Sequence, residues 1–454
     1  MLQSINPATE ELINEYPEMD ILQVGDIIKN TDNAFHVWKK TNFNERSRLM
    51  TKAANTLREK KEELGKIITL EMGKPITQAV AEVEKCALVC DYYAENAEKF
   101  LDDEVIETEA SKSFVAFQPI GVVLAIMPWN FPFWQVFRFA APALMAGNAG
   151  ILKHASNVSG CALEIEKIFI DAGFPENLFR TILIKSSKME DVIADPLIQA
   201  VTITGSVPAG KAVATKAGSL LKKTVLELGG SDPYVVLEDA DIEMAAAVCV
   251  TAKLINGGQS CIAAKRFIIV ESVYEKFVDL FVSKLKKIKM GDPFDENNLL
   301  GPQASSSLRE ELHQQVKESI SKGASLLLGG EKPEMVGAYY PVTILSDVKK
   351  GMPAYDDELF GPVACIIKAK DEEEAIFIAN DTVFGLGAAV FTKDKMKGEM
   401  VAKNKLFAGS CFVNSFVKSD PRLPFGGVKE SGYGRELSSF GIREFVNIKT
   451  VLVE

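Results

Sequence analysis

The chain of 454 residues is longer than one ordinary hydrophobic core supports, so we expect two or three domains. Apolar residues make up 47% and charged residues 25%, which is typical of globular proteins and excludes a disordered or fibrous one. The net charge of −11 argues against a nucleic-acid-binding protein, because phosphate backbones need a basic surplus.

The N-terminal segment, the cysteines and the histidines indicate which compartment and which kinds of partner to expect. The first residues hold no basic segment leading into an apolar run, so we expect no signal peptide. The apolar run 119–129 is about half as long as a membrane span, so we expect no membrane partner. Seven scattered cysteines favour reduced thiols in the cytoplasm over a disulfide framework. The three histidines lack metal-ligand spacing, so we expect no metal.

Helices are predicted first along the chain, and alternating strands and helices follow. Residues 44–100 are expected to form two or three helices, because apolar side chains recur there at helical spacing. From about residue 114, β-rich runs alternate with helical stretches, which predicts parallel strands with helices on both faces of a sheet. The expected strands are 114–129, 149–155, 178–184, 198–205, 223–230 and 232–239.

The alternation starts again after residue 264. The simplest organisation is therefore two α/β domains with a boundary near the double glycine at 229–230. Cys261 lies just past that boundary, where a cleft between domains would hold ligands. Strands are expected at 265–272, 360–369 and 386–393, and helices at 274–288 and 308–323.

The stretch NGGQSCIAAKRF at 256–267 places two glycines, a glutamine and a serine just ahead of Cys261. A cysteine thiolate is a strong nucleophile, and a glycine-rich approach brings backbone N–H groups close to a substrate oxyanion. A buried packing cysteine does not need such backbone freedom. Cys261 is therefore a candidate catalytic nucleophile, with a structural role as the alternative.

A second candidate group begins at Asn130, where an apolar strand meets an apolar helix. Helical spacing would place Trp134 and Arg138 about 40° and 80° round from Asn130, so that all three face one pocket. The amide can donate to an oxyanion, and an arginine among apolar neighbours needs an anion. That anion is either a substrate carboxylate or a structural carboxylate of the protein.

Glu227, Gly205, Ser206 and Lys153 lie at the ends of expected strands. Burial would raise the pKa of Glu227 toward that of a general base, and a hinge ion pair is the alternative. The turn at Gly205 and Ser206 before a helix can cradle a phosphate, and Lys153 can pair with a phosphate or a ribose.

These pieces together resemble the aldehyde dehydrogenase superfamily. The matching motifs occur in the family's order and spacing, from near residue 6 to the end of the chain. They are PWNFP (128–132), TGS (204–206), ELGG (227–230), GGQSC (257–261), ELFGP (358–362) and PFGGVKESGYGRE (424–436).

The resemblance implies a role for each matching residue. Cys261 would attack the aldehyde, and the Asn130 amide with the Cys261 backbone N–H would hold the oxyanion. After hydride transfer to the nicotinamide, Glu227 would activate the water that hydrolyses the thioester. The dinucleotide would contact Trp129, Asn130, Lys153, Ser156, Gly205, Ser206, Leu228, Glu358 and Phe360.

The resemblance also implies an α/β aldehyde dehydrogenase-like fold. Its parts would be a Rossmann-like cofactor domain, an α/β catalytic domain and a small oligomerisation extension. The cofactor domain would hold 1–104 and 119–228, the catalytic domain 229–434, and the extension 105–118 and 435–454. A homodimer or homotetramer is expected on the same grounds.

The residues after Lys153 bear on the choice of dinucleotide. The usual family pattern is Lys-x-x-Glu, whose carboxylate accepts from the ribose 2′-hydroxyl, whereas here Ser156 stands in place of the glutamate. Serine can donate to a 2′-phosphate that glutamate would repel, so we expect NADP to be preferred and NAD to be used more weakly. Alternatively, Ser156 only fills space and NAD is used.

For the substrate, residues 131–138 and 153–157 resemble the NADP-preferring bacterial succinate-semialdehyde dehydrogenases of this family. Succinate semialdehyde is therefore the expected small-molecule substrate. The alternative is a broader dehydrogenase of small or medium-chain aldehydes, or of glutarate semialdehyde, that uses NAD. Arg138 would hold the distal carboxylate and Trp134 would shape the pocket, with Ser260 and Ser419 as further donors.

Two more distant alternatives are weaker. A CoA-acylating relative would pass the thioester to CoA, and Glu227 argues against it as the base of the hydrolytic branch. A binding or structural protein without catalysis would be expected to lose Cys261 or Glu227, and both are present.

Overall fold

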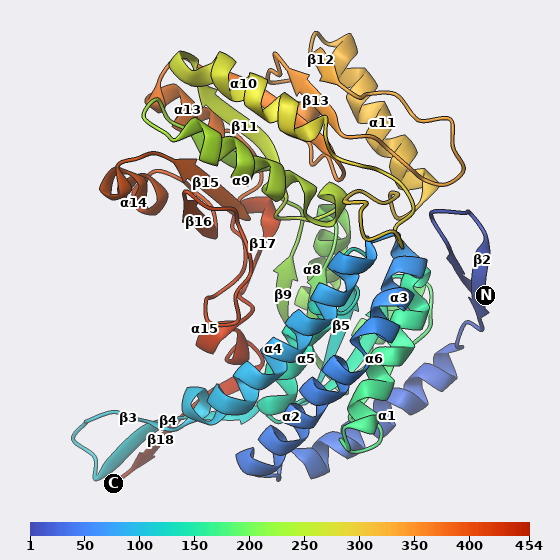
Figure 1. Ribbon diagram of the computed structural model, residues 1–454. Helices are drawn as coiled ribbons and strands as arrows, with labels where there is room; N and C mark the ends of the chain where they lie inside the picture. Colours follow the sequence, from blue (N-terminus) through green and yellow to red (C-terminus); the bar gives the residue numbers. More distant parts are fainter.

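The computed structural model describes residues 1–454 as two large α/β bodies with a small projecting sheet (Figure 1). The longest helix is α4 (Ile76–Leu101), and no helix is both long and apolar enough to cross a membrane. The other helices are α1 (Ile21–Trp38), α2 (Phe43–Glu59), α3 (Lys61–Met72), α5 (Trp134–Met145), α6 (Ser159–Asp171), α7 (Met189–Ala194), α8 (Val207–Ser219), α9 (Ile242–Leu254), α10 (Glu271–Leu285), α11 (Ser306–Ser321), α12 (Pro353–Asp356), α13 (Glu372–Asn380), α14 (Lys395–Asn404) and α15 (Ser438–Ile442).

The first body is built around a six-stranded sheet. Its inner strands are parallel and mostly buried, as expected for a sheet covered by helices. At one edge, β17 pairs antiparallel with β9, so a segment from the far end of the chain lies beside Glu227. The strand order is β17 (Gly432–Tyr433), β9 (Lys223–Glu227), β8 (Ile198–Thr204), β5 (Val122–Met127), β6 (Ala149–His154) and β7 (Phe179–Thr181).

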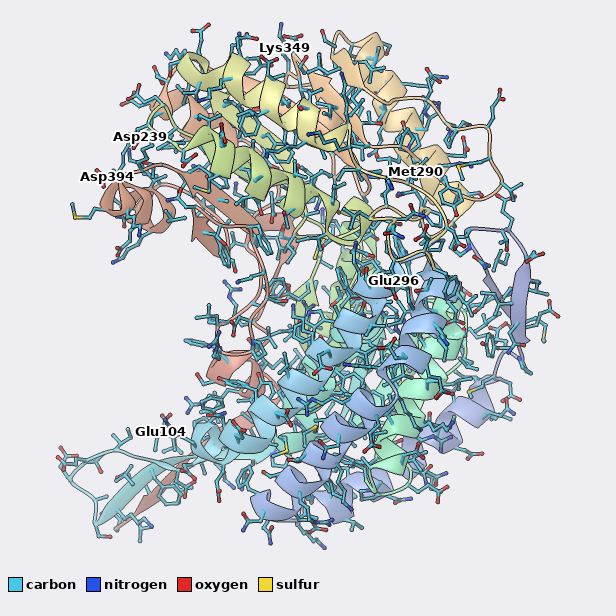
Figure 2. The ribbon with its side chains drawn as sticks, viewed as in Figure 1. Glu104, Asp239, Met290, Glu296, Lys349 and Asp394 are labelled. Carbon is cyan, nitrogen blue, oxygen red and sulfur yellow. The ribbon has the colours of Figure 1, made fainter.

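The second body holds a seven-stranded sheet in which only the edge strand β12 is antiparallel. The loops after β10 and β15 are joined, because Asp239 accepts hydrogen bonds from the Thr392 hydroxyl at 2.7 Å and from the Asp394 backbone N–H at 3.3 Å (Figure 2). The strand order is β12 (Ser325–Leu328), β13 (Thr343–Ser346), β14 (Val363–Ala369), β11 (Ala264–Val270), β10 (Asp232–Val236), β15 (Gly387–Phe391) and β16 (Ser410–Val413).

A small three-stranded sheet projects away from the first body (Figure 1). Its order is β18 (Val446–Val453), β4 (Lys112–Pro119) and β3 (Glu104–Val105), and Glu104 marks its base (Figure 2). A separate hairpin of β1 (Leu2–Ile5) and β2 (Leu12–Tyr16) begins the chain. The predicted domain boundaries remain a prediction.

The expected α/β fold is confirmed, and so are the helices predicted within 44–100. The single strand predicted at 114–129 is wrong, because β4 and β5 belong to different sheets. Ile120 and Gly121 separate them, and Gly121 has a φ of 137°, which residues with a side chain rarely adopt. Such a turn is hard to predict within an apolar run, because the residues on both sides of the turn are apolar.

Candidate active site

A cavity of about 320 Å³ opens beside Cys261 and takes its lining from both bodies. The structure thus brings together residues that are far apart in the sequence. The predicted site residues that line it are Trp129, Asn130, Gly205, Ser206, Leu228, Cys261, Glu358 and Phe360.

Cys261 follows a turn that only glycine can make. Gly257 and Gly258 have φ values of 61° and 78°, and a Cβ on Gly258 would lie 2.0 Å from the Gly361 carbonyl oxygen. The glycine-rich approach to Cys261 therefore has a steric cause: it lets the chain pass close to the loop that carries Glu358 and Phe360.

The thiol of Cys261 is held in its neutral form. Burial raises its pKa to about 12, and the nearby charges of Lys265 and Arg138 oppose this rise. Lys265 donates to the carbonyl oxygens of Ser260 and Cys261, each at 2.7 Å, which fixes the backbone around the thiol. Formation of a thiolate here requires a proton acceptor.

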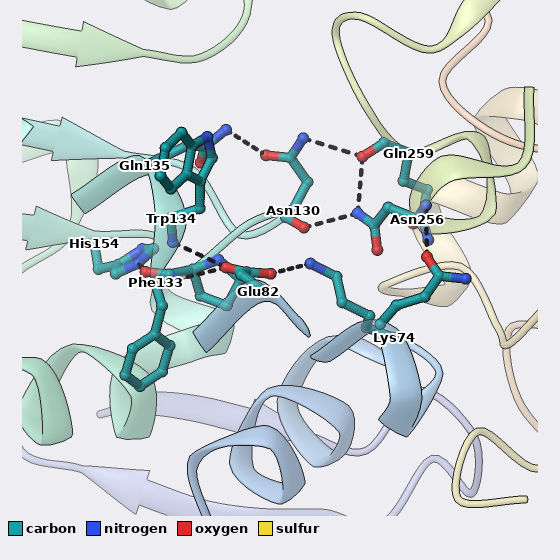
Figure 3. A network of polar contacts seen from close by, with 11 residues as sticks. Lys74, Glu82, Asn130, Phe133, Trp134, Gln135, His154, Asn256 and Gln259 are labelled. Atoms are coloured by element: carbon teal, nitrogen blue, oxygen red, sulfur yellow. Dashed lines mark hydrogen bonds and ion pairs between the residues drawn. The ribbon is translucent and has the colours of Figure 1, made fainter. Parts of the chain in front are cut away.

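The side-chain amide of Asn130 is oriented by hydrogen bonds at both ends (Figure 3). Its Nδ2 donates to the Gln259 carbonyl at 3.0 Å, and its Oδ1 accepts from Gln135 Nε2 at 3.0 Å. One Nδ2 hydrogen is left over for a ligand in the cavity. Asn130 lies in the loop before α5, so the predicted helical spacing applies only to Trp134 and Arg138.

The loop that carries Asn130 is fixed from several sides. Asn256 Nδ2 donates to the Asn130 carbonyl at 2.7 Å, and His154 Nε2 bonds the Pro132 carbonyl at 2.8 Å (Figure 3). His154 Nδ1 accepts from the backbone N–H of Ala155, so its hydrogen is on Nε2. Burial lowers the pKa of His154 to about 4, which keeps the ring neutral.

Glu82 of α4 caps the start of α5. Its Oε1 accepts from the backbone N–H groups of Phe133 at 2.9 Å and Trp134 at 3.0 Å, and its other oxygen forms a buried ion pair with Lys74 (Figure 3). A carboxylate at a helix N-terminus satisfies N–H groups that have no partner within the helix. Glu82 thereby ties α4 to the segment that follows Asn130.

Glu227 ends β9 and lies in register with Thr204 of β8. Both of its carboxylate oxygens are buried without a hydrogen-bond partner. Burial and the negative charge of Glu436 raise its pKa to about 8, while Arg138 opposes the rise. Such a carboxyl group exchanges its proton near neutral pH, as a general base requires.

Arg138 is buried in α5 and has a carboxylate partner within the protein. It forms an ion pair with Glu436, donates to Thr204 Oγ1 at 3.3 Å and lies over the ring of Phe425 at 4.8 Å. It is absent from the lining of the cavity beside Cys261. The contacts of Arg138 therefore match the structural ion pair that the sequence analysis gave as the alternative. A contact between Arg138 and a substrate carboxylate remains a prediction.

Trp134 and Ser419 are brought together by a residue that the sequence did not single out. Lys85 of α4 donates to Ser419 Oγ at 2.7 Å, and its Nζ lies 4.0 Å from the ring centroid of Trp134. Ser260 is buried, next to Cys261. These residues lie outside the cavity lining described above.

Glu358 and Phe360 form the far wall of the cavity. Glu358 accepts from the Gly230 backbone N–H at 3.1 Å and pairs with Lys265 at 3.2 Å. Phe360 meets Trp129 edge to face, with ring centroids 5.7 Å apart. A Cβ on Gly229 would lie 2.4 Å from Glu358 Oε2, so glycine is needed there for the carboxylate to reach the cavity.

Lys153, Ser156 and Ser206 lie on neighbouring elements of the first body. Ser206 caps α8, and a Cβ on Gly205 before it would be in contact only with the Ile203 side chain, at 3.8 Å. Lys153 is buried, donates to Ser186 Oγ at 2.9 Å and has no carboxylate partner. Ser156 is exposed at the start of a short 3₁₀ turn, Ser156–Val158.

Gln135, Lys265, Gln259 and Glu436 were missed as site residues in the sequence. Gln259 lies inside a quoted motif and Gln135 interrupts an apolar helix, so both carried a weak signal. Glu436 ends the motif at 424–436 and Lys265 lies in the stretch 256–267, but their ion pairs join separate elements, so their roles could not be predicted from the sequence.

The chain matches the model of the aldehyde dehydrogenase family over residues 1–451. It is 49% identical to the "Probable succinate-semialdehyde dehydrogenase [NADP(+)]" of Synechocystis sp., with 100% of this chain and 99% of that one covered. It is 47% identical to the "Succinate semialdehyde dehydrogenase [NAD(P)+]" of Escherichia coli, with 99% and 97% covered.

A solved structure is similar over the same length. The succinic semialdehyde dehydrogenase of Streptococcus pyogenes in complex with NADP+ superposes with a TM-score of 0.98 at 37% identity, and the match covers 100% of both chains. Both sequence and fold thus match over nearly the whole length. The cavity lining holds eight of the predicted site residues, and Glu227, Lys153 and Ser156 lie outside it. The chain belongs to the aldehyde dehydrogenase family.

Proposed function

We propose that this chain oxidises succinate semialdehyde to succinate, with NADP preferred and NAD used more weakly. The observation that carries the proposal is one cavity that gathers Cys261, Asn130 and most of the dinucleotide candidates. It is supported by relatives that carry the name of this reaction at up to 49% identity.

Cys261 is the nucleophile in this proposal. Glu227, whose charge acts on the thiol, is the base that can accept its proton. The sulfur then bonds to the aldehyde carbon, and the carbonyl oxygen becomes an oxyanion. The unused Asn130 Nδ2 hydrogen and the Cys261 backbone N–H would hold that oxygen.

Glu227 acts again after oxidation. When bound, NADP would accept the hydride that leaves the tetrahedral adduct, and the adduct on Cys261 would become a thioester. Glu227 first releases the thiol's proton to solvent and then takes a proton from water. The water oxygen bonds to the thioester carbon and the carbon–sulfur bond breaks. The thiolate takes up the proton of the new carboxylic acid, so succinate and the thiol are released. A carboxyl pKa of about 8 suits a base that must gain and lose a proton in each turnover.

The residues present fit a phosphorylated dinucleotide. The N-terminus of α8, which follows the turn at Gly205, can receive a diphosphate, as helix N-termini commonly do. The buried Lys153 lacks a carboxylate partner, so an anion would stabilise its charge. Glu358 offers a carboxylate to ribose hydroxyls, and Trp129, Leu228 and Phe360 offer apolar contact.

The preference for NADP depends on Ser156 and Lys153. Ser156 is exposed and carries no charge that would repel a 2′-phosphate. Relatives with NADP or NAD(P) in their names support the preference and the weaker use of NAD.

Two further parts of the proposal concern the assembled protein. The projecting sheet exposes Val105, Ile106, Ile448 and Leu452 by 50% to 70%, which supports an interface in a homodimer or homotetramer. Light scattering of the purified chain tests this, and a monomer would contradict it. The seven unpaired cysteines support the cytoplasm as its compartment.

The test is a set of initial rates with succinate semialdehyde and with butyraldehyde, each with NADP and with NAD. We expect kcat/KM for succinate semialdehyde to be at least about tenfold higher with NADP than with NAD and to exceed that for butyraldehyde. Good turnover of butyraldehyde with little turnover of succinate semialdehyde would contradict the substrate. It would favour the broader aldehyde dehydrogenase, which the Arg138–Glu436 pair would also allow.

A further inference from the structure

The backbone N–H of Cys261 is one of the two proposed oxyanion donors, and its direction depends on how the peptide group before it is held. This N–H and the Ser260 carbonyl belong to one planar peptide group, in which they point in opposite directions. A donor that holds the Ser260 oxygen on one side therefore aims the Cys261 N–H to the other side. Two donors hold that oxygen, the Ala263 backbone N–H at 3.1 Å and Lys265 Nζ at 2.7 Å.

Lys265 is a buried cation whose three N–H donors all have an acceptor. It lies on β11, and only 1% of its surface is exposed. Besides the Ser260 carbonyl, its Nζ donates to the Cys261 carbonyl at 2.7 Å and pairs with Glu358 Oε1 at 3.2 Å. An ammonium group has three donors, so these acceptors satisfy it and offset the free energy lost by burying its charge.

A second lysine, Lys253 of α9, is buried nearby without such contacts. No part of it is exposed, and its Nζ has no hydrogen-bond partner. Burial and the charge of Lys265 lower the pKa of Lys253 to about 7. Of these two buried amines, only Lys265 is hydrogen-bonded to the segment that carries Cys261.

Lys265 acts on the reacting centre from behind the wall of the cavity. Its Nζ lies 5.8 Å from the ring centroid of Phe360, and Phe360 and Cys261 line the cavity whereas Lys265 does not. Burial raises the pKa of the Cys261 thiol to about 12, and the charge of Lys265 opposes this rise more than any other charge. A positive charge at this place stabilises a thiolate on Cys261 and an oxyanion formed beside it.

We infer that Lys265 is the positioning residue of the oxyanion site, because its ammonium group holds the Ser260–Cys261 peptide with the N–H toward the aldehyde oxygen and makes that N–H a stronger donor. The positive charge at the carbonyl oxygen draws electron density from the peptide nitrogen, which strengthens the hydrogen bond on the opposite side. The same ammonium group joins the segment of the nucleophile to Glu358 on the far wall of the cavity. The inference deepens the proposed function and rests on its assignment of Cys261.

The first test measures the first turnover of Lys265→Met with NADP and succinate semialdehyde, in which NADPH formation reports attack by Cys261 and hydride transfer. The rate constant at saturation is expected to fall about 10- to 100-fold, as for the loss of a hydrogen bond to a charged group. The aldehyde concentration that gives half of this rate should change little, because the oxyanion forms only after binding. Lys265→Arg keeps a cation with several donors and should recover part of the rate.

The second test measures alkylation of Cys261 by iodoacetamide at pH 8, without aldehyde or cofactor, and follows the modified peptide by mass spectrometry. The rate in Lys265→Met should fall about tenfold, because the thiol loses the charge that favours its thiolate. Lys253→Met is the matched control, since it removes an equally buried amine that has no hydrogen bond to this segment. It should leave both rates near those of the wild type.

Rates in Lys265→Met that equal those of the wild type, or equal losses in Lys253→Met, would overturn the inference. So would a double-mutant cycle in which Lys265→Met has no effect in the Glu358→Gln background, because Lys265 would then act only through the cofactor wall. If Lys265→Met does not fold, Lys265→Gln carries the same comparisons. Poor turnover of succinate semialdehyde by the wild type, with alkylation that still depends on Lys265, would instead overturn the proposed function.

Discussion

The two sides of the reacting centre differ in how their polar groups are satisfied. On the side of Asn130, each end of the amide has a hydrogen-bond partner. On the side of Glu227, two carboxylates and one guanidinium are buried together, and the oxygens of Glu227 have no partner. The first arrangement suits a group that must keep its orientation, and the second suits a group that must change its protonation state.

The largest expected effect comes from removing the sulfur atom of Cys261, which lies between the Asn130 side and the Glu227 side. Cys261→Ala should abolish dehydrogenase activity, because no other thiol lines the cavity. Binding of NADP, measured by quenching of tryptophan fluorescence, should remain. Measurable turnover by this variant would refute the assignment of the nucleophile.

The second prediction uses pH to test the Glu227 side alone. With a pKa of about 8, Glu227 is protonated below that pH, so its action as a base falls roughly tenfold per unit as the pH drops. Where thioester hydrolysis limits turnover, kcat at pH 6 should be about a hundredth of its value well above pH 8. A kcat that stays flat from pH 6 to 8 would contradict this role.

The charged neighbours of Glu227 can shift this profile. Glu436 and Glu444 raise its pKa, and Arg138 and Arg435 lower it. Glu436→Gln should therefore move the midpoint to lower pH, which separates titration of Glu227 from titration of the substrate or cofactor.

The third prediction tests the Asn130 side. Gln135→Met keeps the size of the side chain and removes the donor to Asn130 Oδ1, so the amide loses its fixed orientation. We expect kcat to fall about tenfold, less than the 10²- to 10³-fold typical of losing an oxyanion donor.

A double-mutant cycle distinguishes orientation of the amide from a general packing role. In the Asn130→Ala background, Gln135→Met should lower kcat little further, because the amide that Gln135 orients is gone. Equal costs in both backgrounds, measured as kcat, would show that Gln135 does not act through Asn130.

The last expected effect, similar in size to that of Gln135→Met, concerns the cofactor. Ser156→Glu adds a negative charge at an exposed position next to the Lys153 region and should shift the NADP-to-NAD ratio of kcat/KM about tenfold toward NAD. Ser156→Ala is its control, since it removes the hydroxyl without adding charge. An unchanged ratio in Ser156→Glu would contradict the role of Ser156.

Features that depend on neighbouring residues could be predicted from the sequence, while the catalytic roles of Cys261 and Glu227 stay predictions. The glycines before Cys261 and the buried end of β9 at Glu227 are local features, and both residues lie where the motifs indicated. The sequence could not identify partners that lie far apart along the chain. Arg138 meets Glu436 and Lys85 meets Ser419 only after folding, across about 300 residues of sequence or more.

The most direct test of the account is the first turnover of Glu227→Gln, mixed rapidly with NADP and succinate semialdehyde and followed by nicotinamide absorbance. In Glu227→Gln, Cys261 can still react slowly with the aldehyde, because its thiol can lose its proton to solvent. Hydrolysis of the thioester should be much slower, because the base that activates water is missing. We predict one equivalent of NADPH per active site, followed by a much slower steady state. Unimpaired steady turnover, or an NADPH yield that never approaches one equivalent, would contradict the assignment of Glu227 as the hydrolytic base.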